Sequence, residues 1–171
     1  MPILIEEPTI NHKIVLLLNN DVVFSHPQAL AEMLNLTQLE TVGCVGALLR
    51  YPNGCVQHLG VELSGELVQH QAHGQQLEAG DPLLQHPRQV TALTAACMMF
   101  RRSLWDELAG FDEDLPVDFN DVDFCLRAQA AGFANLVTPR AEAIHLESAS
   151  RGREAHVTFA DSLRIMKVRW G

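Results

Sequence analysis

Apolar positions in this chain fall into short runs that are separated by polar turns. Residues 13–19 (KIVLLLN) form a nearly continuous apolar run that stops at Asn-Asn-Asp, which is typical of a strand buried on both faces of a sheet. The turn residues of 51–54 (YPNG) predict a hairpin between the segments on either side. Four further segments predict strands: 42–50, 55–63, 90–102 and 134–139.

Between these strands, apolar residues recur at helical spacing. The first predicted helix has Ser25 or His26 as its cap and Pro27 near its first turn. Its apolar face would consist of Ala29, Leu30, Met33 and Leu34. Three more helices are expected: one that Ser103 caps and Gly110 ends, one from Asp121 to Ala131 after a cap at Asn120, and a C-terminal amphipathic one within 153–171.

The order of strands and helices predicts an α/β fold with a mixed, mostly parallel sheet flanked by helices, as in Rossmann-like proteins. A length of 171 residues suits a single domain over residues 1–171. Residues 68–88 are rich in Gln, His, Gly and Pro and predict a long surface loop. The three-residue spacing of His70 and His73 would suit a metal site only on a helix, so solvated side chains are favoured there.

The net charge of -9 disfavours nucleic acid or an anionic membrane as the main partner and favours a polar or cationic ligand such as a metal. The four cysteines form no Cys-x-x-Cys pair, which indicates reduced thiols rather than a zinc or redox motif. The first residues, MPILIEEPTI, lack the basic flank of a secretory signal. These features predict a cytoplasmic protein.

Residues 110–133 combine six carboxylates with many apolar side chains. A calcium loop of the EF-hand type does not fit, because Pro116 and Val117 stand at its fifth and sixth positions, where a ligand and a glycine are needed. Acids in the first turn of a helix complement its dipole, which explains Asp121 and Asp123. The remaining four acids lie before that helix, so a functional site and solvated loop acids both stay open.

A second polar group, Asn19, Asn20 and Asp21, follows the strand of residues 13–19. Asn and Asp are common turn formers, but ligands of α/β proteins bind at the carboxyl ends of strands. A single histidine such as His145 is more often structural than a ligand. Asp21 and His145 together could hold a divalent ion.

Four segments in order resemble the family 2 glycosyltransferases of the glycosyltransferase-A fold, over about residues 15–152: LLLNND (16–21), VTALTAACMMFRRSLWDELAGFDE (90–113), DFNDVDFCLRAQAAGF (118–133) and TPRAEAIHLESASRG (138–152). The resemblance implies that Asp121 is the general base and that Asp21 and His145 bind a divalent cation, Mn²⁺ or Mg²⁺. It assigns substrate binding to residues at three places: Asn19 and Asn20, Thr94, Ala95 and Ala96, and Asn120.

By this resemblance the protein is a metal-dependent, inverting transferase that moves a sugar from a nucleotide-diphosphate sugar to a glycan or lipid-linked acceptor, in bacterial surface polysaccharide synthesis. Asn19 departs from the family's first acid at the Asp-x-Asp position. About a dozen residues precede LLLNND, where family members have the nucleotide-binding half of the sheet. The chain therefore resembles the carboxyl-terminal portion of such an enzyme, and an exposed sheet edge would favour a homo-oligomer.

Two other functions stay open at this stage. A non-catalytic α/β interaction module would use the sheet edge or the C-terminal helix as its partner surface. A nucleotidyltransferase would need a glycine-rich or basic phosphate clamp near the amino end, and the sequence has none there. The basic C-terminal helix could contact the inner face of the membrane, although its stripe of Phe159, Leu163, Met166 and Trp170 favours packing against the domain.

Overall fold

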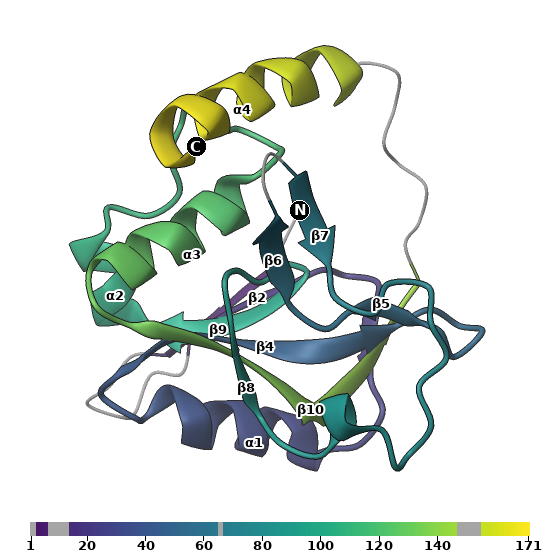
Figure 1. The fold of residues 1–171 in the computed structure, drawn as a ribbon. Coiled ribbons are helices and arrows are strands. Elements are labelled where there is room, and N and C mark those ends of the chain that lie inside the picture. Colours follow the sequence, from purple (N-terminus) through teal and green to yellow (C-terminus); the bar gives the residue numbers. More distant parts are fainter. Residues whose placement is uncertain (1–2, 7–13, 65–66, 147–154) are drawn as a thin grey trace.

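The computed structural model of the chain describes residues 3–6, 14–64, 67–146 and 155–171, with side chains placed from residue 14 onward except at 64–68 and 147–158 (Figure 1). Its strands are β1 (Ile3–Glu6), β2 (Ile14–Leu18), β3 (Val22–Phe24), β4 (Val42–Arg50), β5 (Val56–His58), β6 (Val61–Ser64), β7 (Leu67–His70), β8 (Arg88–Val90), β9 (Cys97–Arg101) and β10 (Ala134–His145). Its helices are α1 (Gln28–Thr37), α2 (Arg102–Glu107), α3 (Asn120–Ala130) and α4 (Ala155–Trp170), with a 3-10 turn at Pro82–Leu84.

The main sheet has the order β1-β2-β9-β4-β10-β3, with β5 added to β4 and β8 added to β10. The expected α/β class with a mixed sheet is confirmed. Only the β4–β10 pair is parallel among the described pairs, so the parallel share is smaller than the sequence predicts. An apolar run indicates that both faces of a strand are buried. It does not determine whether that strand pairs parallel or antiparallel with its neighbours.

The two faces of the sheet bury separate cores. Along β2, Val15 and Leu17 belong to one core while Ile14 and Leu16 belong to the other, as the side-chain alternation of a strand requires. Figure 1 shows α1 under one face and α3 and α4 over the opposite face. The continuous apolar run of residues 13–19 is therefore explained, and β2 is a central strand whose outer neighbour is β1.

The predicted strands are found with four corrections. Residues 55–63 form two strands, β5 and β6, which belong to different sheets. Residues 90–102 form β8 and β9 instead of one long strand. Between them Ala92 and Leu93 are fully buried and Ala92 makes a single bridge to Val61, which gives the segment the apolar pattern of a strand. β10 continues past residue 139 to His145, because a register shift between Thr138 and Glu142 accommodates Pro139. Residues 67–70, expected in a loop, are β7 and pair with β6.

The helices lie where the periodicity predicts them, but their caps differ. The N-cap residues are Pro27 for α1, Arg101 for α2 and Phe119 for α3, and none caps through its side chain. Ser25, His26, Ser103 and Asn120 are thus not caps. An N-cap side chain contributes about 1 kcal/mol to the stability of a helix, so the packing of the helix, rather than its cap, decides at which residue the helix begins. Leu30, expected on the apolar face of α1, is 41% exposed.

Cysteines and the C-terminal helix agree with the sequence. Cys44, Cys97 and Cys125 are buried and Cys55 is half-buried, and all four are free thiols; burial raises the pKa of Cys97 to about 12, which keeps its thiol protonated. Met166 of α4 packs in the core beside α3. Within the described residues, the helices are too short or too polar to cross a membrane.

Candidate functional site

A first group of polar side chains gathers where β2 ends and β10 ends. β3 pairs antiparallel with β10, and the Val22–His145 register places His145 beside the turn that holds Asp21. The Nε2 atom of His145 lies 3.1 Å from Oδ1 of Asp21. Asn19 donates from Nδ2 to the same Nε2 over 3.3 Å. Two residues that are 124 positions apart in the sequence are therefore neighbours through one strand pair.

The other nitrogen of His145 fixes the state of the ring. Nδ1 lies 2.7 Å from Oε1 of Gln57, on β5, which can only accept, so Nδ1 carries the proton. Nε2 then accepts from the amide of Asn19, and its lone pair lies beside the carboxylate oxygen of Asp21, where a cation could bind both atoms. A metal-binding histidine is usually held in this way, with its other N–H donated to an oxygen. The donor set and its separation fit a small divalent cation, whose neighbouring ligands stand about 3 Å apart.

A second group centres on Asp121, in the first turn of α3. Its Oδ2 accepts from the backbone N–H of Ala95 at 2.9 Å, and its Oδ1 accepts from the N–H of Val122 at 2.8 Å. Burial raises the pKa of Asp121 above the ordinary value, while these N–H donors and the nearby His70 oppose the rise. Asp121 is thus a half-buried carboxylate with a fixed orientation and a raised pKa, which suits a group that accepts a proton.

Residues 94–96 join the two groups. The N–H of Asn19 donates to the carbonyl of Ala96 at 2.9 Å, and the N–H of the preceding residue, Ala95, donates to Asp121. Thr94 accepts from the N–H of Ala96 through Oγ1 at 3.3 Å, which closes this turn before β9. The Asp21–His145 pair and Asp121 therefore lie on two sides of one short backbone segment.

Most of the residues singled out in the sequence come together here: Asn19, Asp21, Thr94, Ala95, Ala96, Asp121 and His145. Asn20 is exposed and Asn120 is half-buried, and neither side chain makes a hydrogen bond within the described part of the chain. Among the described residues, no three His, Cys, Asp or Glu side chains are grouped as a metal site.

The acidic stretch separates into distinct environments. Asp123 does not serve the helix dipole as expected, because its fully buried carboxylate binds Arg127, Arg169 and Trp170. Glu113 and Asp114 are exposed, as solvated loop acids are. Asp118 has a buried Oδ2 atom without a hydrogen-bond partner.

The histidines of the predicted loop also differ from a solvated pair. His70 lies 3.2 Å from His58, between their Nδ1 atoms, and His73 Nε2 lies 2.9 Å from the hydroxyl of Tyr51. His58 is buried, and burial together with the charges of His70 and His73 lowers its pKa to about 3. This cluster and Gln57 were missed because single polar residues in short strands have no periodic signal.

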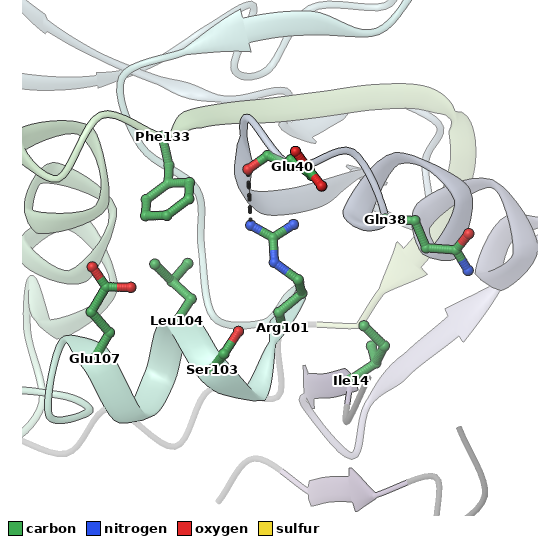
Figure 2. A pocket seen from close by; sticks show the side chains of 8 residues that line it. All are labelled: Ile14, Gln38, Glu40, Arg101, Ser103, Leu104, Glu107 and Phe133. Carbon is green, nitrogen blue, oxygen red and sulfur yellow. Dashed lines mark hydrogen bonds between the residues drawn. The ribbon is translucent and has the colours of Figure 1, made fainter. Parts of the chain in front are cut away.

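A cavity of about 520 Å³ lies at the start of β2 and the end of β9, at the opposite end of these strands from Asn19 and Ala96 (Figure 2). Figure 2 shows Arg101 at its centre, donating to the carbonyl of Glu40, with Leu104 and Phe133 on one side. The guanidinium also donates to the carbonyls of Thr37 and Val42. Its contacts hold the end of α1 against β9, so this cavity is separate from the candidate site.

A sequence model of the glycosyltransferase-like family 2 matches residues 3–171. The chain is 41% identical over 168 residues to the uncharacterized protein y4gI of Sinorhizobium fredii, covering 92% of this chain and 18% of the relative. It is 34% identical over 157 residues to the O-antigen biosynthesis protein RfbC of Myxococcus xanthus, covering 84% of this chain and 12% of the relative. The chain thus spans less than a fifth of the length of either relative.

Among solved structures, the fold is similar to that of the mannosyltransferase PcManGT from Pyrobaculum calidifontis, in complex with GDP-Man and Mn²⁺. The TM-score is 0.58 at 15% identity, and the match covers 92% of this chain and 40% of that one. At this identity the likeness concerns the fold, which is that of the glycosyltransferase-A enzymes.

Proposed function

Since the chain belongs to the glycosyltransferase-like family 2, we propose that it carries the reaction centre of an inverting transferase. The transferred sugar would come from a nucleotide-diphosphate sugar and go to a glycan or lipid-linked acceptor. The observation that carries the proposal is the placement of Asp121 and of the Asp21–His145 pair on two sides of residues 94–96.

Asp121 is the proposed general base. Inverting transfer is a single displacement, so one carboxylate must take the proton of the acceptor hydroxyl as that oxygen attacks the sugar. One oxygen of Asp121 is held by Ala95 and the other by Val122, which fixes the direction in which the carboxylate presents its remaining lone pairs. Its raised pKa makes it a stronger proton acceptor than an exposed aspartate.

Asp21 and His145 are the proposed ligands of Mn²⁺ or Mg²⁺. Divalent ions at phosphate sites are usually held by one or two protein side chains together with the substrate's phosphates, which agrees with a pair of ligands. When bound, the cation would neutralise negative charge on the departing diphosphate. Gln57 keeps the Nδ1 proton of His145 in place and so keeps Nε2 available.

The donor sugar is proposed to lie against residues 94–96, between the two groups. Asn19, Asn20, Thr94, Ala95, Ala96 and Asn120 are the proposed substrate-binding residues. The exposed side chain of Asn20 and the hydroxyl of Thr94 offer hydrogen bonds of the kind that sugar hydroxyls accept and donate. The likeness to an O-antigen biosynthesis protein supports a polysaccharide or its lipid-linked precursor as the acceptor class.

The proposal is tested by Asp121→Asn in the full-length protein, with Asp114→Asn as the matched control in the same acidic stretch. The rate of nucleoside diphosphate release is measured with UDP-, GDP- and dTDP-linked sugars. Loss of a general base lowers the rate by about 10² to 10⁴-fold, so Asp121→Asn should be nearly inactive and the control should match the wild type. An Asp121→Asn protein with wild-type turnover would reject Asp121 as the base, whereas a wild-type protein that turns over none of these donors would favour the interaction module.

A further inference from the structure

The C-terminal helix is joined to the helix of the proposed base through one buried carboxylate. Asp123, two residues after Asp121 in the first turn of α3, is fully buried. Its Oδ1 accepts from Nη1 of Arg169 at 2.8 Å and from the indole N–H of Trp170 at 3.0 Å. Its Oδ2 accepts from Nε of Arg127 at 2.7 Å. A buried carboxylate with three such donors is a strong and directional anchor.

The same arginine also holds the loop that leads into α3. Arg169 Nη1 lies 2.8 Å from Oδ2 of Asp112, so one guanidinium bridges both ends of the segment from Asp112 to Asp123. From α3, Arg127 reaches the carbonyls of Leu108 and Gly110, at 2.6 and 2.8 Å. Arg127 thereby ties the chain between α2 and α3 to α3, and Arg169 ties it to α4.

The backbone at the start of α3 is in an unfavourable conformation that needs such support. Phe119 has a φ of 64°, in the left-handed region, and its carbonyl accepts from the N–H of Asp123 at 2.8 Å. A bulky residue rarely adopts that region unless its surroundings hold it there. The ring of Phe119 packs on Phe159 of α4, with centroids 5.2 Å apart. Contacts from α4 therefore reach the residues on both sides of Asp121, and Figure 1 shows the two helices on the same face of the sheet.

We propose that Arg169 and Trp170 are positioning residues for Asp121, acting through Asp123. The inference rests on the proposed function of Asp121 as the base. Ala95 fixes the carboxylate of Asp121 from one side of the turn, and α4 fixes the turn itself from the other. Displacement of a catalytic group by about 1 Å can cost up to 10²-fold in rate, whereas the Asp21–His145 pair lies on other elements and does not depend on α4.

The test uses Arg169→Gln and Trp170→Phe in the full-length protein. The second change keeps an aromatic ring and removes the N–H donor, together with part of the ring system. Arg169→Lys serves as the conservative rescue, and Arg164→Gln is the matched control because Arg164 is 77% exposed on the same helix and its ion pair within the described part of the chain is with the neighbouring Asp161, at 3.7 Å. Two measurements are made: kcat and donor KM from nucleoside diphosphate release, and hydrogen exchange of the amides of residues 122–124.

We expect kcat to fall about tenfold in Arg169→Gln and in Trp170→Phe, with donor KM within twofold of the wild type. Exchange in the first turn of α3 should become faster in both variants, Arg169→Lys should recover part of the loss, and Arg164→Gln should be unchanged. Unaltered exchange in the first two variants overturns the proposal without any substrate. Wild-type kcat despite faster exchange overturns it as well, and so does a loss of kcat that is matched by a rise in donor KM.

The two sets of variants distinguish a failure of the positioning role from a failure of the proposed function. If Asp121→Asn is inactive while Arg169→Gln and Trp170→Phe keep full activity, only the positioning role fails. If Asp121→Asn is active, the base assignment fails and the positioning role fails with it.

Discussion

The hydrogen bond between Gln57 and His145 gives a quantitative test of the proposed cation site. Gln57 Oε1 accepts from Nδ1 of His145 at 2.7 Å, and the side chain of His145 is only 12% exposed. Gln57→Leu keeps a similar volume and removes the acceptor, so the ring can turn and the proton can move to Nε2. Loss of a partner of this kind typically weakens metal binding by 10 to 100-fold.

The size of the effect follows from linkage between binding and unfolding. With Mn²⁺ and UDP at about 100 times the wild-type Kd, the folded state gains about 2.7 kcal/mol. A Kd that is 10 to 100-fold higher reduces this gain to about 0.4–1.4 kcal/mol at the same concentrations. For a chain of 171 residues, 1 kcal/mol corresponds to about 2–4 °C in Tm. The ligand-dependent rise in Tm should therefore drop from about 5–11 °C to about 1–6 °C.

The assay is differential scanning calorimetry of each variant with and without the ligands, so that any direct effect of the substitution on Tm cancels. Gln76→Leu, at an exposed glutamine of the segment after β7, is the control and should keep the full rise. Asp21→Ala should abolish it. A Gln57→Leu protein with the wild-type rise would refute the role of Gln57, and an unchanged rise in Asp21→Ala would refute the site.

Three predictions concern stability. Since burial raises the pKa of Asp121 above 3.8, its contribution to stability is present below that pH and lost as the pH rises through the raised pKa; the loss of Tm between pH 4 and pH 7.5 should therefore be smaller in Asp121→Asn than in the wild type, and an equal loss in both would contradict this. The pKa of His58 falls from 6.5 to about 3, so the free energy of unfolding should decrease by about 1.4 kcal/mol per pH unit as the pH falls below 6.5. Urea titrations from pH 6.5 to 5 measure this decrease, and a constant free energy of unfolding would contradict a buried neutral ring. Gly60→Ala and Gly74→Ala both place alanine at positive φ, +95° and +75°, but only the first brings Cβ to 2.5 Å from Val90. Backbone strain should lower the free energy of unfolding by about 1–2 kcal/mol in both variants, and the close contact should lower it by about 1–3 kcal/mol more in Gly60→Ala. Equal losses in urea unfolding would be evidence against the close contact.

Elements with a strong burial pattern are the part of the fold that the sequence predicts. β2 and β4 pack on both faces, which leaves no polar position inside them, and their bounds agree with the apolar runs to within one residue. The direction of pairing was not predictable, because it depends on the connections between strands. Residues 91–96 were mistaken for part of a strand since Ala92 and Leu93 are fully buried in a segment that makes only a single bridge, between Ala92 and Val61, among the described residues.

The site was predictable only in part, for a related reason. Before any resemblance was considered, Asp21 and His145 were already joint candidates for holding a divalent ion, and the family resemblance implied the same role; the β3–β10 register then explains their contact. Gln57 could not be singled out from the sequence, because a polar residue between the buried Val56 and His58 resembles any solvent-facing position of a strand.

The acidic stretch combines local instability with compensating contacts around one turn of helix. Burial raises the pKa of Asp121, Phe119 adopts a left-handed conformation, and Asp118 keeps a buried oxygen without a partner. Such features are tolerated where the surrounding structure fixes them, and they concentrate at functional sites. Here Arg169 and Arg127 fix the turn through Asp123. Two carboxylates of the stretch thus have different roles. Asp123, whose charge is paired with Arg127 and Arg169, holds α3 in place. Under the proposed function, Asp121 then presents its charge to the substrate.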